Sequence, residues 1–222
     1  DHPCGAQLMG NDPAEFAAAA RTLVELGFDA IDVNFACPVR KVLGRQRGGY
    51  LLGQPDAALD IVARLRDALP AAVPLTVKLR CGLDDSPESR DRFYAIFDGA
   101  FGLGAAAVTV HGRTVEQRYR GTASWDFLGE VKRRAGDRTV LGSGDLFTAQ
   151  ACRDMMRRTG VDGVTVARGA IGNPWIFAQA RVIFEGKPLP PPPTLFEQRD
   201  VILEHYRMAE EIYGSWRCGR LM

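Results

Sequence analysis

The stretch AIDVNFACPVRKVLGRQRGGYLLGQPDAALDIVARLRDALPAAVPLTVKLR, residues 30–80, decides the fold because it contains a strand, a helix and a second strand in that order. Short apolar runs at 30–34 and 74–80 predict the two strands, and residues 55–69 carry their apolar side chains on one helical face. A helix that returns the chain between two strands makes those strands pair in parallel. The stretch therefore predicts an α/β fold.

The same unit recurs along most of the chain. A short first strand is expected to end near Gln7, followed by a helix that starts at Pro13 behind Asp12 as N-cap. Further strands are predicted at 106–112, 139–145 and 162–169, and further helices near 88–102, 124–134, 147–158 and 173–184. Six strand–helix units fit either an open doubly wound sheet or a (β/α)8 barrel from which two N-terminal units are missing.

Polar residues lie just past the centre of each predicted strand. In a barrel the C-terminal strand ends form the active-site face. Any single polar residue there is as well explained by the start of a loop, but six in series favour a site. The six are Gln7, Asn34, Lys78, His111, Ser143 and Arg168.

Two of these residues and two loops suggest ligand binding. Lys78 lies in an apolar strand, so it needs an anionic partner unless it reaches water at the strand end. His111 precedes a Gly-Arg turn, which favours a functional residue over a core histidine. Glycines at 142–146 and 167–174 follow the last two strands, where barrels commonly bind phosphate, although each cluster alone is weak. Neither a P-loop nor a Rossmann fingerprint is present.

Cys37 follows the strand at 30–34 and precedes a basic stretch without any acid up to Tyr50. A free cysteine is most often a small buried apolar residue, but this position faces the predicted active side. Neighbouring cations would favour a thiolate nucleophile, whereas burial under a substrate would favour a neutral thiol that donates a proton. The sequence leaves both roles open. The cations are Arg40, Lys41, Arg45 and Arg47.

Composition excludes several classes of protein. The 222 residues carry a net charge of +1, so nucleic-acid affinity would have to come from local patches. Five widely spaced cysteines without a C-x-x-C pair argue against a disulfide framework and a structural metal site. No run of 18 apolar residues and no signal peptide is present, which predicts a cytoplasmic enzyme without membrane contact.

The chain changes character after Lys187. PLPPPPT at 188–194 predicts a stiff linker, and an amphipathic helix follows at 195–214. We therefore expect a catalytic domain at 1–187 and the start of a helical domain at 188–222. The first residue is Asp1 and the last lies in a helical pattern, so we expect a fragment of a longer protein.

Four motifs resemble the bacterial type of the tRNA-dihydrouridine synthase family, in that family's order. They are IDVNFACPVRKV (31–42), VKLRCG (77–82), VTVHGRTVEQRYRGTASWDFL (108–128) and GVTVARGAIGNPWIF (163–177). The resemblance extends from Gln7 to Phe184. It implies a TIM barrel, (β/α)8, of which about six units are present, followed by the first helix of a tRNA-binding domain.

The resemblance also implies an activity: FMN-dependent reduction of tRNA uridine to 5,6-dihydrouridine with NADPH. Hydride would reach C6 from reduced flavin, and Cys37 would give a proton to C5. Lys78, His111 and Gln7 match residues that contact the flavin, and Asn34 matches one beside substrate and flavin. The matching phosphate-binding residues are Ser143, Gly144, Asp145, Ala167, Arg168 and Gly169. Ser143 and Ala167 depart from the Asn and Gly that are frequent in the family.

Under this reading the four cations after Cys37 would contact RNA phosphates, and the protein would act as a monomer. Two alternatives remain at this point. One is a flavin barrel that acts on a small pyrimidine or another small molecule. The other is a non-catalytic RNA-binding remnant. The basic stretch at 40–47 and the C-terminal helix favour an RNA substrate over a small one.

Overall fold

The computed structural model describes residues 3–214 and divides the chain into two units, residues 1–185 and 186–222. The division lies close to the boundary expected at Lys187. Residues 1–2 and 215–222 of the two predicted domains lie outside the described residues.

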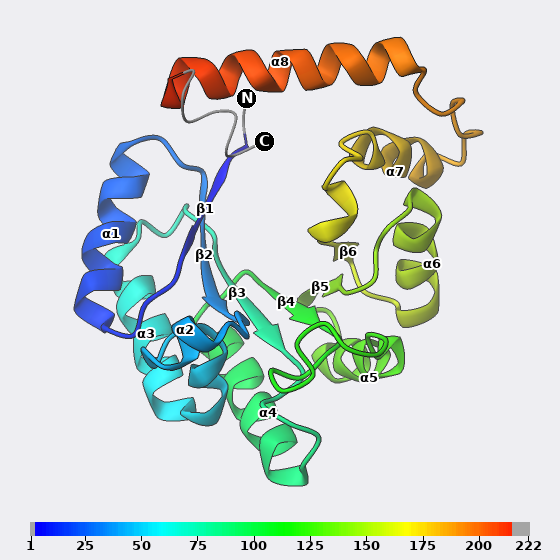
Figure 1. The fold of residues 1–222 in the computed structure, drawn as a ribbon. Helices are drawn as coiled ribbons and strands as arrows, with labels where there is room; N and C mark the ends of the chain where they lie inside the picture. The colour runs from blue at the N-terminus through cyan, green and yellow to red at the C-terminus, as the bar shows by residue number, and fades with distance from the viewer. Residues whose placement is uncertain (1–2, 215–222) are drawn as a thin grey trace. The chain divides into compact units, whose positions relative to one another are not determined.

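The first unit contains one sheet of six parallel strands in sequential order (Figure 1). The strands are β1 (Gly5–Leu8), β2 (Ala30–Phe35), β3 (Leu75–Arg80), β4 (Ala107–His111), β5 (Thr139–Ser143) and β6 (Gly163–Val164). A doubly wound sheet reverses its strand order at a switch point, and this sheet does not. Its order is that of a (β/α) barrel, as predicted, and the alternative of a doubly wound sheet is excluded.

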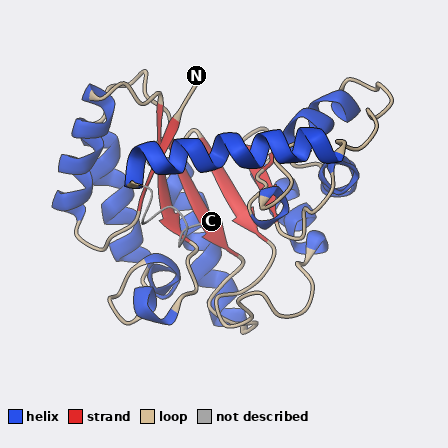
Figure 2. Cartoon of the chain, turned by 45° about the horizontal axis from the view of Figure 1, so that its top comes forward, coloured by secondary structure: helices blue, strands red, loops and turns tan. Residues whose placement is uncertain are grey.

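The crossover helices cover the outer face of the curved sheet (Figures 1 and 2). They are α1 (Pro13–Glu25), α3 (Pro55–Ala68), α4 (Pro87–Gly102), α5 (Trp125–Ala135) and α6 (Ala149–Thr159), and α7 (Ile176–Phe184) follows β6. Asp12 accepts hydrogen bonds from the backbone N–H groups of Ala14 and Glu15, which confirms it as the N-cap of α1.

The two faces of the sheet differ in chemistry. Ile31, Val33 and Phe35 of β2 are fully buried beneath the helices, and burial stabilises each such side chain by about 1.5–3 kcal/mol. Alternation along the strand turns Asp32 and Asn34 to the concave face. The register aligns Asn34 with Lys78, and it aligns Arg80 with His111 and Ser143. Apolar packing thus holds a polar inner face in place.

Two segments differ from the sequence prediction. The basic stretch after Cys37 is not simply a loop: it forms a short helix α2 (Arg40–Leu43) and a 3-10 segment, η1 (Gly48–Gly53). The sixth strand is much shorter than the predicted 162–169. Pairing with β5 ends at Val164, and the chain then leaves the extended conformation at Ala167 and forms a 3-10 turn, η2 (Arg168–Ala170).

In the second unit, residues 188–194 have no regular structure and α8 (Leu195–Tyr213) follows. Thr194 and Glu197 form a reciprocal capping box at its start. Several apolar side chains of α8 are exposed, among them Phe196, Ile202 and Ile212. The predicted helix is confirmed.

Among residues 3–214, none of the helices has both the length and the apolar character that crossing a membrane requires.

Candidate functional site

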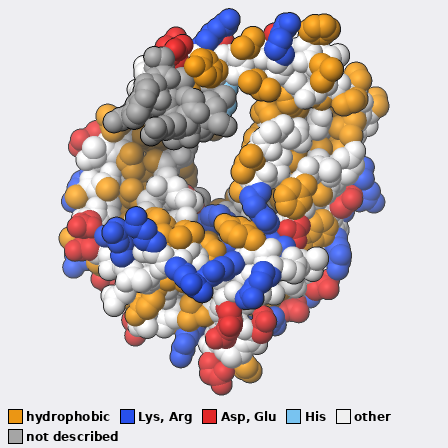
Figure 3. All heavy atoms as spheres, viewed as in Figure 1, with side chains coloured by type: hydrophobic (Ala, Val, Ile, Leu, Met, Phe, Trp, Pro, Cys, Tyr) orange, Lys and Arg blue, Asp and Glu red, His pale blue; other side chains and the backbone are white. Residues whose placement is uncertain are grey.

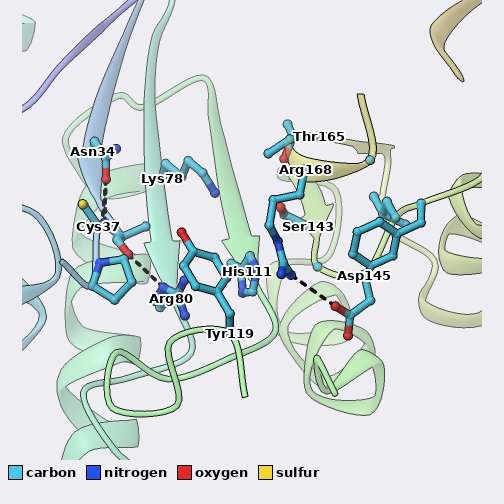
Figure 4. Close-up of a pocket in the computed structure, with 17 residues that line it drawn as sticks. Asn34, Cys37, Lys78, Arg80, His111, Tyr119, Ser143, Asp145, Thr165 and Arg168 are labelled. Atoms are coloured by element: carbon cyan, nitrogen blue, oxygen red, sulfur yellow. Dashed lines mark hydrogen bonds and ion pairs between the residues drawn. The ribbon is translucent and has the colours of Figure 1, made fainter. Parts of the chain in front are cut away.

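A cavity of about 200 Å³ lies at the C-terminal ends of the strands (Figure 4). Its lining comes from the ends of β2 to β6 and from the loops that follow them. Of the residues predicted for the site, it brings together Asn34, Cys37, Lys78, His111, Ser143, Gly144, Asp145, Ala167, Arg168 and Gly169.

Cys37 lies in one wall of the cavity, and hydrogen bonds to the backbone of Ala36 and Cys37 hold this wall in place. The side-chain oxygen of Asn34 accepts the N–H groups of Ala36 and Cys37, at 2.9 and 3.1 Å. Arg80 Nε donates to the Ala36 carbonyl at 2.8 Å, and Gly49 N–H donates to the Cys37 carbonyl at 3.0 Å. The turn that carries the thiol is therefore fixed on both sides.

Gly48 lets the chain fold back onto this turn. Its φ of +59° lies in the left-handed region, and an added Cβ would lie 2.9 Å from Cys37 Cβ. The φ favours glycine, and the close approach to Cys37 leaves no room for a side chain. The basic segment that begins after Cys37 thus returns to pack directly against it.

Lys78 and His111 form the floor of the cavity. Burial lowers the pKa of Lys78 to about 8, although the charge of Asp32 partly opposes the shift. Burial, together with the neighbouring cations, lowers the pKa of His111 to about 3. The imidazole is therefore neutral near pH 7. Its Nδ1 accepts the Arg113 N–H at 3.2 Å, so Nε2 carries the hydrogen and can donate it to a ligand.

The opposite wall is built around Asp145. Its Oδ2 accepts hydrogen bonds from Ala123 N–H at 2.7 Å and from Arg113 at 2.8 Å, and Arg168 lies 3.5 Å from its Oδ1. Burial raises the pKa of Asp145, but these partners outweigh burial and hold it below its usual value. Arg113, which the sequence suggested as part of a functional turn, is buried and supports this wall.

The loops after β5 and β6 are packed tightly on each other. A Cβ added at Gly169 would collide with the Leu146 carbonyl, so glycine is required for the contact. The Arg168 guanidinium lies 4.5 Å from the ring centre of Tyr119 and 5.4 Å from that of Phe147. This packing holds the Arg168 cation at the cavity wall.

Five predicted residues lie outside the cavity lining. The amide of Gln7 donates to Asp32 at 2.6 Å and accepts from Asn34 at 2.8 Å. The others are the four cations: Arg40, Lys41 and Arg45 are exposed, and Arg47 is partly buried. Figure 3 shows Lys and Arg side chains gathered over α2 and over the loop after β4.

A second groove adjoins the cavity, with Tyr119 on the boundary between them. Arg40, Arg118 and Arg120 line it together with Asp84 and Glu116. Of the four predicted cations, Arg40 thus lines a groove that shares Tyr119 with the cavity.

Sequence reasoning missed Arg80, Tyr119 and Thr165, which also line the cavity. Arg80 could have been found, because it lies two residues after Lys78 in the same strand and so faces the same side. Tyr119 lies in a loop without periodicity, although it is part of the 108–128 motif. Thr165 follows the short β6 and lies in the 163–177 motif, but nothing in the sequence set it apart from its neighbours.

The donors around the cavity fit an anionic, oxygen-rich cofactor. In the part of the chain that the structure describes, Lys78 has no hydrogen-bond partner, and the buried hydroxyl of Thr165 also lacks one. His111 Nε2 and Arg168 supply further donors. No group of three potential metal-binding side chains occurs within residues 3–214.

Two solved structures share the fold. D-glucarate dehydratase from Agrobacterium tumefaciens aligns with a TM-score of 0.52 and 16% identity, over 72% of this chain and 38% of that one. The 3,6-anhydro-D-galactonate cycloisomerase from Zobellia galactanivorans aligns with a TM-score of 0.54 and 10% identity, over 82% and 43%. At such identities the likeness concerns the fold alone.

Sequence comparison is far more specific. A probable tRNA-dihydrouridine synthase from Mycobacterium tuberculosis is 39% identical over 97% of this chain and 55% of its own length. The tRNA-dihydrouridine synthase B of Xanthomonas campestris is 36% identical over 96% and 62%. A probable synthase from Rickettsia prowazekii is 36% identical over 97% and 64%. The chain thus spans somewhat more than half the length of these relatives.

The model of the dihydrouridine synthase (Dus) family matches residues 1–220, nearly the whole chain. The sequence motifs, the strand order and the cavity are consistent with this match. The chain belongs to the dihydrouridine synthase family.

Proposed function

We propose that the protein reduces uridine in tRNA to 5,6-dihydrouridine, with FMN as cofactor and NADPH as reductant. One observation carries this proposal. Cys37 lines the cavity from one side, while the donors that suit a flavin and its phosphate line it from the others. Family membership supports the same reaction.

The residues that would hold FMN fall into two groups. Lys78 and the Nε2 hydrogen of His111 would contact the ring system, together with Gln7, whose amide has one N–H without a partner among residues 3–214. The phosphate would lie against Ser143, Gly144, Asp145, Ala167, Arg168 and Gly169, where backbone N–H groups and the Arg168 guanidinium are available. Bound FMN, once reduced by NADPH, supplies the hydride that C6 of the uracil ring receives.

Cys37 acts as the proton donor to C5 in this proposal. Hydride addition to the C5=C6 bond leaves negative charge that a positioned acid removes by protonating C5, and such an acid contributes about 10²–10⁴-fold to a rate. The thiolate that remains takes a proton from solvent. Asn34 Oδ1 accepts the Cys37 N–H and Gly49 N–H donates to the Cys37 carbonyl, which keeps the thiol in place, and Asn34 would offer its second amide N–H to the substrate.

The tRNA would approach over the basic surface. Arg40, Lys41, Arg45 and Arg47 follow Cys37 directly, so they can meet phosphates next to a uridine that lies over the thiol. The target base must leave its stack to reach the cavity. Residues 188–222, with α8, would contribute to RNA binding. A monomeric state and a cytoplasmic location stay predictions.

The test has two stages. The purified protein is mixed with FMN and washed, and retained visible absorption of flavin is expected. It is then given NADPH with unmodified tRNA, or with free uridine or orotate as small-molecule controls. Dihydrouridine formed in tRNA alone would support the proposal. Turnover of a small pyrimidine but not tRNA, or RNA binding without flavin retention, would overturn it in favour of one of the two alternatives.

A further inference from the structure

A chain of hydrogen bonds crosses the concave face from β3 to the Cys37 turn. Thr76 Oγ1 donates to Asp32 Oδ1 at 2.6 Å, and Gln7 Nε2 donates to Asp32 Oδ2 at 2.6 Å. Asn34 Nδ2 donates to Gln7 Oε1 at 2.8 Å, and Asn34 Oδ1 accepts the Cys37 N–H at 3.1 Å. Asp32 does not line the cavity, and it is linked to the Cys37 turn through Gln7 and Asn34.

We call this chain of hydrogen bonds the relay. The group at one end can only accept a hydrogen bond, and the group at the other end can only donate one. An ionised carboxylate only accepts hydrogen bonds, and a backbone N–H only donates. The amides of Gln7 and Asn34 could each be turned over, which would exchange donor and acceptor. With Asp32 ionised, only one orientation of both amides satisfies every bond, and that orientation presents the Asn34 oxygen to the Cys37 turn.

We propose that Asp32 is a positioning residue for Cys37: its carboxylate sets the direction of the Gln7 and Asn34 amides and so fixes the turn that carries the thiol. The role in proton delivery rests on the proposed function, whereas the positioning itself does not. Burial raises the pKa of Asp32, a cost that the hydrogen bonds from Thr76 and Gln7 and the charge of Lys78 oppose.

A competing explanation is that Asp32 only balances the charge of Lys78, which faces it from β3. The two explanations differ in what Gln7 does. Positioning requires the Gln7 amide to transmit direction from Asp32 to Asn34, while charge balance does not involve Gln7.

The two explanations can be separated by reversing the donors and acceptors along the relay. Asn34→Asp places the Gln7 amide between two carboxylates, so one of its contacts must pair two acceptors. Repulsion at that contact displaces the side chain at position 34 and so loosens the turn that it holds. Adding Asp32→Asn restores a consistent chain: Asn at 32 donates to Gln7, Gln7 donates to Asp at 34, and that carboxylate accepts the Cys37 N–H. The double variant should therefore recover what Asn34→Asp alone has lost.

The readout is alkylation of Cys37 by iodoacetamide in flavin-free protein, followed by peptide mapping, so it needs no enzymatic activity. Release of the turn should raise the Cys37 rate about tenfold in Asn34→Asp, because local opening exposes the thiol. The Asp32→Asn/Asn34→Asp variant should return to within about threefold of wild type. Thr76→Val, which removes a partner of Asp32 without reversing polarity, should stay near wild type.

Simple relief of repulsion between the two carboxylates would also give a rescue, so the pair is repeated with Gln7→Met. The rescue should vanish there, because the transmitting amide is gone. A rescue that persists with Gln7→Met, no rescue in the double variant, or no effect of Asn34→Asp would each overturn the proposal. Each variant is first checked for a cooperative thermal transition. Failure of tRNA reduction in wild type would refute the proposed function and leave this result unaffected.

Discussion

The turns after β2 and β3 both place a cysteine at the end of a strand, yet the two thiols have different surroundings. Cys37 lines the main cavity with Lys78 and His111. Cys81 lines a separate cavity, where Asp84 and Asp85 are neighbours. Burial raises the pKa of the Cys81 thiol to about 12, so it stays protonated at neutral pH.

The difference comes from the polar residues that precede each turn. Asn34 can accept hydrogen bonds, and it bends the chain by binding the N–H groups of Ala36 and Cys37. The corresponding inward residues of β3, Lys78 and Arg80, can only donate. Lys78 and Arg80 therefore line the cavity, and Arg80 also donates to neighbouring backbone carbonyls. Cys81 does not line this cavity. A strand-end position alone does not bring a thiol into the site.

The largest expected contrast is in alkylation by iodoacetamide. With a pKa of about 12, only about one Cys81 in 10⁴ is a thiolate near pH 8. Peptide mapping of the labelled protein should show Cys37 modified at least about 100-fold faster than Cys81, because the raised pKa leaves so little Cys81 thiolate to react. Equal rates would remove the distinction between the two turns.

A glycine packed near each turn allows a second comparison between the two turns. Gly48→Ala would press on Cys37 Cβ, whereas Gly82→Ala would meet Ser89 Oγ at 2.7 Å, and both glycines have positive φ. Each change should lower the unfolding free energy by about 1–3 kcal/mol. Only Gly48→Ala should also reduce tRNA reduction per folded protein, by about 10- to 100-fold, since it displaces the thiol. A comparable loss in Gly82→Ala would contradict the assignment of the site to one turn.

Strand β3 places a cation, Lys78, in the cavity rather than a thiol. The charge of Lys78 should make FMN binding depend on pH. The pKa of Lys78 is about 8 in the free protein, so the ammonium is present below that pH and is lost above it. The Kd for FMN, measured by fluorescence, should rise above pH 8 by up to about tenfold per pH unit. Lys78→Met should weaken binding and remove this dependence, while Lys41→Met, on exposed α2, should change neither. A wild-type Kd that does not change across pH 8 would exclude Lys78 as a charged contact.

Much of the fold follows from the sequence because strand and helix periods alternate without interruption, and polar residues recur at the strand ends. The α2 helix was missed because four residues carry no apolar period, and β6 was overestimated because its pairing with β5 already ends at Val164 although the apolar pattern continues.

The candidate site was predicted less completely. Motif residues such as Cys37 and Lys78 could be assigned from the resemblance, and the cavity brings them together. The resemblance also gave Gln7 a flavin contact, but the hydrogen bonds that Asp32, Gln7 and Arg113 make could not be predicted, because they join residues that are distant in the chain. Only the three-dimensional register shows that Gln7 bridges Asp32 and Asn34.

The most direct test of the account compares Cys37→Ala with Cys81→Ala in a single assay. Unmodified tRNA is incubated with FMN, NADPH and each variant, and dihydrouridine is measured by mass spectrometry. The account predicts a loss of about 10²–10⁴-fold for Cys37→Ala and a rate within about threefold of wild type for Cys81→Ala. Full activity in Cys37→Ala, or an equal loss in both variants, would contradict the central claim that the turn after β2 supplies the proton donor.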